Sequence, residues 1–173
     1  MKFRLLFFLF LAFGNKANAQ LRELGGKMTQ EETNENNAYK LEQYKELLKQ
    51  IQAGKKEIPA DQPEFEQEVT NGVAWHQLLT GDFKGAEKTL NKGLKKVATY
   101  EYFLSNYPPA LLFQGKYKEA KKAYAALKDT EMKVLKKSYK EVFLEDLAEI
   151  EKTGFVAEAQ KEDLAKMRAF LKE

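Results

Sequence analysis

The chain has 173 residues, of which 43% are hydrophobic, 32% charged and 12% aromatic, a composition typical of one soluble globular domain. It contains no cysteine and a single histidine, His76, which excludes disulfides, thiolate nucleophiles, iron–sulfur clusters and metal sites built from several histidines. The formal net charge is +3, but this excess lies in the first 19 residues, and residues 20–173 carry 26 basic and 26 acidic groups. With only three arginines in the chain, this balance gives no support to a nucleic-acid partner.

Residues 1–19 have the three-part pattern of a secretory signal. Basic residues Lys2 and Arg4 precede an apolar run over residues 5–14, and a short polar stretch ends in an A-x-A cleavage site, Ala17-Asn18-Ala19. The apolar run is shorter than the roughly 20 residues that a membrane-spanning helix needs. We therefore predict a signal peptide cleaved after Ala19, a periplasmic or secreted product, and no stable membrane insertion of that product.

The next segments are predicted from polarity and helical periodicity. Residues 20–37 are polar and have few large apolar side chains, which predicts a flexible tether. From Tyr39, apolar residues recur every three or four positions and predict a helix that ends near Gly54. After a break, Pro63 is expected just inside the start of a second helix that ends near Thr80, with Asp61 or Gln62 as its cap.

Further helices are expected over residues 84–97, 108–128 with an internal break, 131–152 and 157–172. The pair Pro108-Pro109 is expected to break a helix and to leave Thr99–Tyr107 as a separate turn, because proline removes a backbone donor and clashes with the preceding turn. No stretch shows the period-two alternation of a strand. We therefore predict that residues 38–173 form a single all-α domain.

Two segments of the chain repeat with a constant offset of 34 residues. Gly81 and Gly115 mark a turn in which glycine allows a positive φ. An aromatic, an alanine and a large apolar residue follow each glycine at matching distances: Phe83 and Tyr117, Ala86 and Ala120, Leu90 and Tyr124. Alanine lets two helix backbones approach closely, so the pattern predicts packed pairs of helices.

On these residues the chain resembles the tetratricopeptide repeat (TPR) family, and more narrowly the exported TPR proteins of Bacteroidetes-like bacteria. The resemblance covers about residues 70–128, and its consecutive repeats read VAWHQLLTGDFKGAEKTLNKGL and ALLFQGKYKEAKKAYAAL. It implies a short right-handed superhelix of helical hairpins with a concave groove and flanking capping helices. Its repeats would span about 67–100 and 101–134, followed by a degenerate third pair at 135–173. It also implies a role in holding other proteins or peptides.

The same resemblance places six side chains of the first helices of the two repeats in the groove: Glu68, Asn71, Trp75, Tyr102, Ser105 and Asn106. Trp75 fits a core position equally well. A competing surface is the row of lysines on the second helix of the first repeat, which faces solvent on the convex side: Lys84, Lys88, Lys92, Lys95 and Lys96. This row lies within residues 84–140, which carry 14 basic and 5 acidic groups.

Candidate catalytic groups are few. His76 has no serine or cysteine partner suggested by spacing, and the pairs Glu145/Glu149 and Glu158/Glu162 are expected on solvated helix faces. We therefore predict an exported, non-catalytic interaction module with an unidentified protein or peptide partner, no cofactor and no metal. The alternatives are an all-α enzyme or accessory subunit of an enzyme, and a structural subunit of a larger envelope complex.

Overall fold

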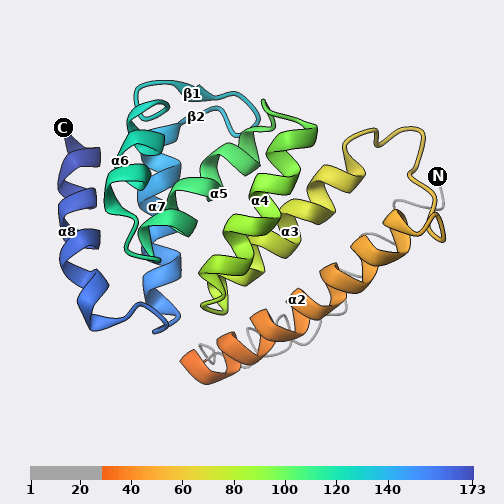
Figure 1. Cartoon of the computed structure of the whole chain (residues 1–173), viewed down its shortest axis with the longest axis horizontal. Helices are drawn as coiled ribbons and strands as arrows, with labels where there is room; N and C mark the ends of the chain where they lie inside the picture. The colour runs from red at the N-terminus through yellow and green to blue at the C-terminus, as the bar shows by residue number, and fades with distance from the viewer. Residues whose placement is uncertain (1–28) are drawn as a thin grey trace, which may run out of the picture.

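The computed structural model describes residues 29–173, so the predicted signal peptide at 1–19 lies outside the described residues (Figure 1). Within this range the chain forms seven helices and one short β-hairpin. The helices are α2 (Gln30–Gln52), α3 (Phe65–Leu79), α4 (Phe83–Lys96), α5 (Glu101–Leu112), α6 (Tyr117–Ala125), α7 (Tyr139–Lys152) and α8 (Glu158–Lys172). The hairpin consists of β1 (Glu131–Met132) and β2 (Lys137–Ser138).

Helices that follow one another in the chain pack side by side. Helix α2 lies on α3, α3 on α4, α4 on α5, α5 on α6, and α7 on α8. The first helices of successive pairs are also in contact, α3 with α5 and α5 with α7. The predicted all-α class is therefore confirmed, with the small hairpin as its one addition among the described residues.

The repeated positions have the conformation and burial that their residue types require. Gly81 and Gly115 have φ values of 78° and 76°, in the left-handed region that glycine adopts without strain. Ala86 on α4 and Ala120 on α6 are 0% exposed. The large residues one turn later, Leu90 and Tyr124, are also completely buried. The turn between α7 and α8 has the same form, since Gly154 has a φ of 78°.

The hydrophobic core is continuous from α3 to α8, and a smaller cluster attaches α2. In this cluster Ile51 of α2 packs with Phe65 and Val69 of α3. The two helices approach closely at Gly72, where an added Cβ would lie 2.4 Å from the Tyr44 ring. Within residues 29–173, none of the helices combines the length and the apolar character needed to cross a bilayer.

Residues 30–37 belong to helix α2, so the predicted tether is wrong over this part. Thr29 and Glu32 form a capping box at the start of the helix. Farther along the chain, the carbonyl of Thr153 accepts hydrogen bonds from Gln30 Nε2 at 2.7 Å and from Asn34 Nδ2 at 3.0 Å. The helix at residues 30–37 depends on this cap and on hydrogen bonds to a residue more than a hundred positions away. The composition of the segment alone could not predict it.

Helix α5 continues through Pro108 and Pro109, so the predicted break and the separate turn at Thr99–Tyr107 are wrong. The prolines remove two amide donors from the helix, a local cost of about 3 kcal/mol or more for an interior proline. Both rings are buried, together with the residues that follow them: Ala110, Leu111 and Leu112. Tertiary packing thus holds a helix that the local sequence disfavours.

Two other local predictions also differ from the structure. The segment 131–138 is a β-hairpin, and α7 begins only after Ser138, which forms a capping box with Glu141. At the start of α3 the N-cap residue is Glu64, which makes no side-chain cap, so neither Asp61 nor Gln62 caps that helix. The hairpin has two residues in each strand, too few to show an alternating pattern in the sequence.

Candidate interaction surface

Glu68, Asn71 and Trp75 share one face of α3, because spacings of three and seven residues bring side chains to the same side of a helix. Glu68 is exposed, and Asn71 is half-buried. Trp75 is also half-buried and packs against the main core. The structure thus shows the packing expected of a core position, and a groove role for Trp75 stays a prediction.

The three predicted residues of α5 do not share one environment. Tyr102 is half-buried, whereas Ser105 is 2% exposed and Asn106 is 4% exposed. Asn106 Nδ2 donates to Asn71 Oδ1 across the α3–α5 contact at 2.9 Å, and Ser105 Oγ donates to the Tyr102 carbonyl at 3.1 Å. Ser105 and Asn106 are thus enclosed between helices, which corrects their expected place in an open groove.

Glu68 lies among three tyrosines. Its negative charge raises the pKa of Tyr44 on α2 and of Tyr100 and Tyr102 at the start of α5, in each case in addition to the larger effect of burial. Partial burial and the neighbouring Glu64 raise the pKa of Glu68 itself. We name this surface the acidic aromatic face and define it by five exposed or half-buried residues: Tyr44, Glu64, Glu68, Trp75 and Tyr102. Tyr100 is 8% exposed and belongs to the main core.

The acidic side chains of this face carry unneutralised charge. Among residues 29–173, neither Glu64 nor Glu68 forms an ion pair, although nearby Glu66 pairs with Lys96 at 2.7 Å on another side of α3. Sequence reasoning missed Glu64 and Tyr44. Helical periodicity predicted the helix that carries Tyr44, but not that this side chain lies against α3.

The lysine row on α4 forms a second charged surface. A shallow, open depression there is lined by Lys84, Glu87, Lys88, Asn91, Lys92 and Lys95. Lys116 at the start of α6 pairs with Glu87 at 2.6 Å, and this hydrogen bond lowers the pKa of the Glu87 carboxyl. The remaining lysines of the depression point to solvent, so the two charged surfaces have opposite signs.

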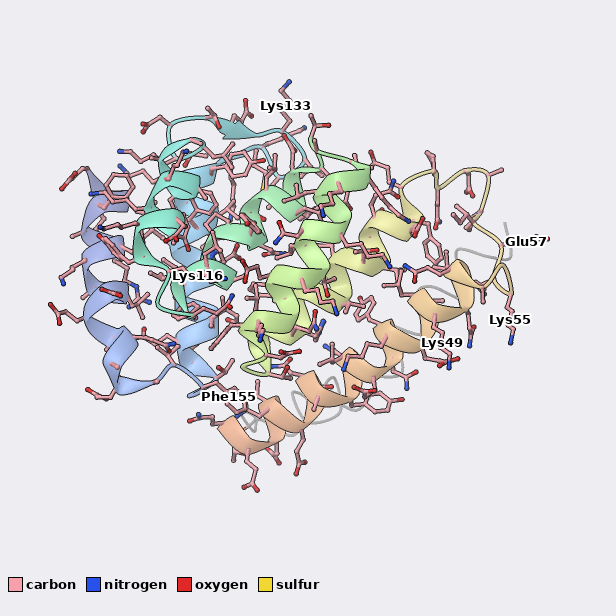
Figure 2. The ribbon with its side chains drawn as sticks, in the orientation of Figure 1. Lys49, Lys55, Glu57, Lys116, Lys133 and Phe155 are labelled. Carbon is pink, nitrogen blue, oxygen red and sulfur yellow. The ribbon has the colours of Figure 1, made fainter. Side chains whose placement is uncertain are left out.

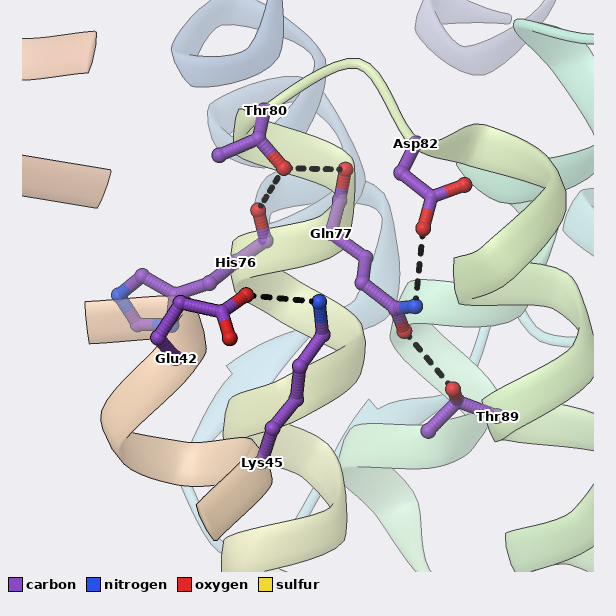
Figure 3. A network of polar contacts seen from close by, with 7 residues as sticks. All are labelled: Glu42, Lys45, His76, Gln77, Thr80, Asp82 and Thr89. Atoms are coloured by element: carbon purple, nitrogen blue, oxygen red, sulfur yellow. Dashed lines mark hydrogen bonds and ion pairs between the residues drawn. The ribbon is translucent and has the colours of Figure 1, made fainter. Parts of the chain in front are cut away.

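His76 is a packed residue of the α2–α3 contact. Its Nδ1 lies 2.9 Å from the Gly72 carbonyl, its ring stacks on Tyr44 with centroids 5.2 Å apart, and burial lowers its pKa. Figure 3 shows the adjacent network, in which the buried Gln77 amide accepts from Thr89 Oγ1 at 2.7 Å and donates to Asp82 at 3.0 Å. The Gln77 contacts join α3 to α4. The contacts of His76 lie between α2 and α3 and give the histidine a structural role.

In each carboxylate pair noted in the sequence, the two glutamates form ion pairs with two different lysines. All four groups form ion pairs: Glu145 with Lys137, Glu149 with Lys152, Glu158 with Lys161 and Glu162 with Lys166. In the described part of the chain, no three acidic, cysteine or histidine side chains are arranged to hold a metal ion.

Asp146, an acidic group that the sequence did not single out, has a raised pKa. Burial, together with the neighbouring Glu145 and Glu149, raises the pKa of Asp146 on α7 to about 7. Asp146 in turn adds to the raised pKa of Tyr124, whose hydroxyl is buried and has no hydrogen-bond partner within the described residues. The pair lies between α6 and α7 inside the stack, away from the acidic aromatic face.

Comparisons of the chain with models of protein families, with curated proteins and with solved structures found no match. The resemblance to TPR proteins therefore stays a prediction based on the repeated residues. The candidate site is defined by its own geometry, an acidic surface with the half-buried aromatic side chains Tyr44, Trp75 and Tyr102 on α2, α3 and α5.

Proposed function

We propose that the protein is an exported, non-catalytic interaction module that holds a protein or peptide partner on the acidic aromatic face. Its frame would be a short TPR-like right-handed superhelix. The observation that carries the proposal is the set of aromatic side chains around the unpaired carboxylates of Glu64 and Glu68. Aromatic side chains that are partly buried and held in place are the usual anchors of protein interfaces.

The charge of this face selects the chemistry of the partner. Partial burial and Glu64 both disfavour the ionised form of Glu68, and the charge of a cationic side chain placed beside it would stabilise that form. Lysine and arginine also interact favourably with the faces of tryptophan and tyrosine rings. The preferred partner is therefore a segment with basic residues, and its association rate should fall as salt is added.

The test is a selection of random linear peptides displayed on phage against the full chain. The proposal expects the selected peptides to be enriched in lysine and arginine. Replacing Tyr102 or Trp75 by alanine should weaken the binding of a selected peptide by on the order of 2 kcal/mol each. Tyr39→Ala is the matched control, because Tyr39 is an exposed aromatic residue of α2 outside this face.

The competing hypothesis is that the partner binds to the lysine row on α4. Under the proposal, Lys88→Glu combined with Lys92→Glu leaves the affinity of basic peptides unchanged or slightly higher, because both residues are exposed and lie outside the acidic aromatic face. Enrichment of acidic peptides, with binding abolished by these two changes and unaffected by Tyr102→Ala, would contradict the proposal and assign binding to α4.

Export is proposed from the pattern of residues 1–19. Cleavage after Ala19 would leave a mature chain that begins at Gln20. Intact-mass measurement on protein purified from its native host tests this directly. A mature mass that still includes Met1 would contradict export by this signal.

A further inference from the structure

The β-hairpin between α6 and α7 is the only non-helical element among the described residues, and it lies at one edge of the molecule (Figure 1). Its strands are antiparallel, with Glu131 opposite Ser138 and Met132 opposite Lys137. Residues 133–136 form the tip between them. Figure 2 shows Lys133 projecting outward from this edge.

The tip is held firmly by the body of the protein. The Glu101 carboxylate accepts hydrogen bonds from two consecutive backbone amides, that of Lys133 at 3.1 Å and that of Val134 at 2.9 Å. Met132 anchors the hairpin because its side chain is completely buried in the main core. The turn closes through Lys136, which has a φ of 53°. The tip is therefore preorganised.

This anchored tip presents apolar and cationic side chains to solvent. Val134 is 53% exposed and Leu135 is 42% exposed, and they are the only adjacent pair among the exposed large apolar residues of the described chain. Lys133 and Lys136 flank this pair, and within residues 29–173 neither forms an ion pair. Lys137 is neutralised by Glu145 at 2.8 Å, so Lys133 and Lys136 are the lysines without an ion pair beside the two apolar side chains. The acidic groups nearby are Glu131 on β1 and the Glu101 carboxylate, which is bound to the tip amides.

We propose that this hairpin tip is a docking point for an anionic lipid bilayer. Val134 and Leu135 enter the boundary between headgroups and acyl chains, and Lys133 and Lys136 lie against the lipid phosphates. The ammonium groups of Lys133 and Lys136 complement the negative surface of such a membrane. The contact is peripheral and reversible, because two apolar side chains bury far less surface than an inserted helix.

The shape of the tip favours a bilayer over a protein partner. A stable protein interface covers about 800 Å² on each partner, typically with about 20 or more residues, whereas the exposed tip consists of four. A fluid bilayer can close around a projecting turn from all sides, so a small tip can still bury both apolar side chains. The proposal does not depend on the acidic aromatic face or on the function proposed for it.

The test uses a fluorescent label that reports its own surroundings, because the apolar run at residues 5–14 of the full chain could itself bind lipid. The chain has no cysteine, so Leu135→Cys provides one labelling position for the polarity-sensitive dye NBD. Ile58→Cys is the matched control, since Ile58 is 43% exposed in the loop after α2. Each labelled full chain is mixed with vesicles of phosphatidylglycerol and phosphatidylcholine, and separately with phosphatidylcholine alone.

We expect a blue shift and a brighter signal from the label at position 135 with phosphatidylglycerol vesicles and no change with phosphatidylcholine alone. The label at position 58 should stay silent with both. Replacing Lys133 and Lys136 by glutamine should weaken partitioning of the tip-labelled chain about 25-fold, since each lysine near an anionic surface contributes about fivefold. Lys92→Gln with Lys95→Gln is the matched charge control and should leave partitioning unchanged.

Circular dichroism melting curves verify that each variant is folded. A silent label at position 135 with anionic vesicles would overturn the proposal, and so would equal shifts at positions 135 and 58. Crosslinking of the tip to a single protein, with no response to vesicles, would also overturn it and identify the tip as a protein contact.

Discussion

Ala120 and Ala86 set how closely the second helix of each repeated pair can approach its neighbours. Both side chains are completely buried, and the spacing of 34 residues had placed them at helix contacts. A larger side chain at such a position forces neighbouring groups out of their preferred rotamers. The residue type is thus explained by the space available, and the sequence was sufficient to predict it.

We predict that Ala120→Leu lowers the free energy of unfolding by about 1–3 kcal/mol, the usual cost of overpacking a core. Urea denaturation followed by circular dichroism measures the change. Lys118→Leu, two residues earlier on the exposed side of α6, is the control and should have little effect. Equal losses from the two substitutions would mean that the repeat alignment does not describe the packing.

Asp146 is predicted to make the stability depend on pH. Its pKa of about 7 in the folded chain exceeds its ordinary value of about 4, so the folded state binds the proton more tightly. The free energy of unfolding should therefore fall as the pH rises from about 4 to about 7 and the buried group ionises. Asp146→Asn removes this penalty.

The variant should be more stable than the wild type at about pH 8, by on the order of 3 kcal/mol, and similar to it near pH 4. Urea denaturation at the two pH values measures the difference. Other groups that titrate in the same range, including His76, are present in both proteins and cancel in the comparison. A constant difference between variant and wild type across this range would contradict the assignment.

At the scale of the elements, the ends of helices show what short-range reasoning could and could not predict. The turns at Gly81 and Gly115, with their aromatic and alanine partners, follow from local residue types and were predicted correctly. The continuous helix α5 and the order at the start of α2 depend on contacts with other parts of the chain. Helix α5 stays continuous because its two prolines are buried in the core. The start of α2 is ordered because two of its side chains donate hydrogen bonds to the Thr153 carbonyl.

The first turns of α2 are predicted to lose order when their hydrogen bonds to Thr153 are removed. Asn34→Ala should increase amide hydrogen exchange over residues 30–38, because Asn34 Nδ2 donates to this carbonyl. Protection of α5 should not change. Glu35→Ala, at an exposed neighbouring position, is the matched control. Unchanged exchange in the Asn34 variant would show that the Asn34 hydrogen bond is not needed to hold this end, which the capping box and Gln30 then keep in place.

The hairpin was also beyond sequence reasoning. Its strands have two residues each, and its tip is held by the Glu101 carboxylate some thirty residues earlier in the chain. The residues between α6 and α7 have helical propensity comparable to that of their neighbours, so periodicity assigned them to a helix. The buried Met132 and the hydrogen bonds to Glu101 are tertiary features that override this preference.

At the scale of the whole molecule, the stack of helices separates charge into distinct surfaces. The acidic aromatic face is built on α2, α3 and α5, and the lysine depression is built on α4. The sequence showed an excess of basic residues over 84–140, but not how charge is distributed over the surface. It did not predict which acidic groups stay unpaired, because the ion pairs of Glu66 and Glu87 are made with residues about thirty positions away.

The six residues expected in a groove from the family resemblance differ between the two helices. Glu68, Asn71 and Trp75 share one face of α3. For α5, spacing alone could not distinguish a side chain that faces a neighbouring helix from one that faces solvent. Ser105 and Asn106 therefore proved to be enclosed, while the half-buried Tyr44 from α2 joined the surface.

The most direct test of the central claim is site-specific photo-crosslinking in the native host, with a photoreactive phenylalanine derivative at Tyr102 or at Lys92. We predict that the probe at position 102 crosslinks to one partner, identified by mass spectrometry, and that Glu68→Lys abolishes this product in a folded protein. The probe at position 92 should give no such product. Crosslinks from position 92 alone, insensitive to Glu68→Lys, would contradict the account.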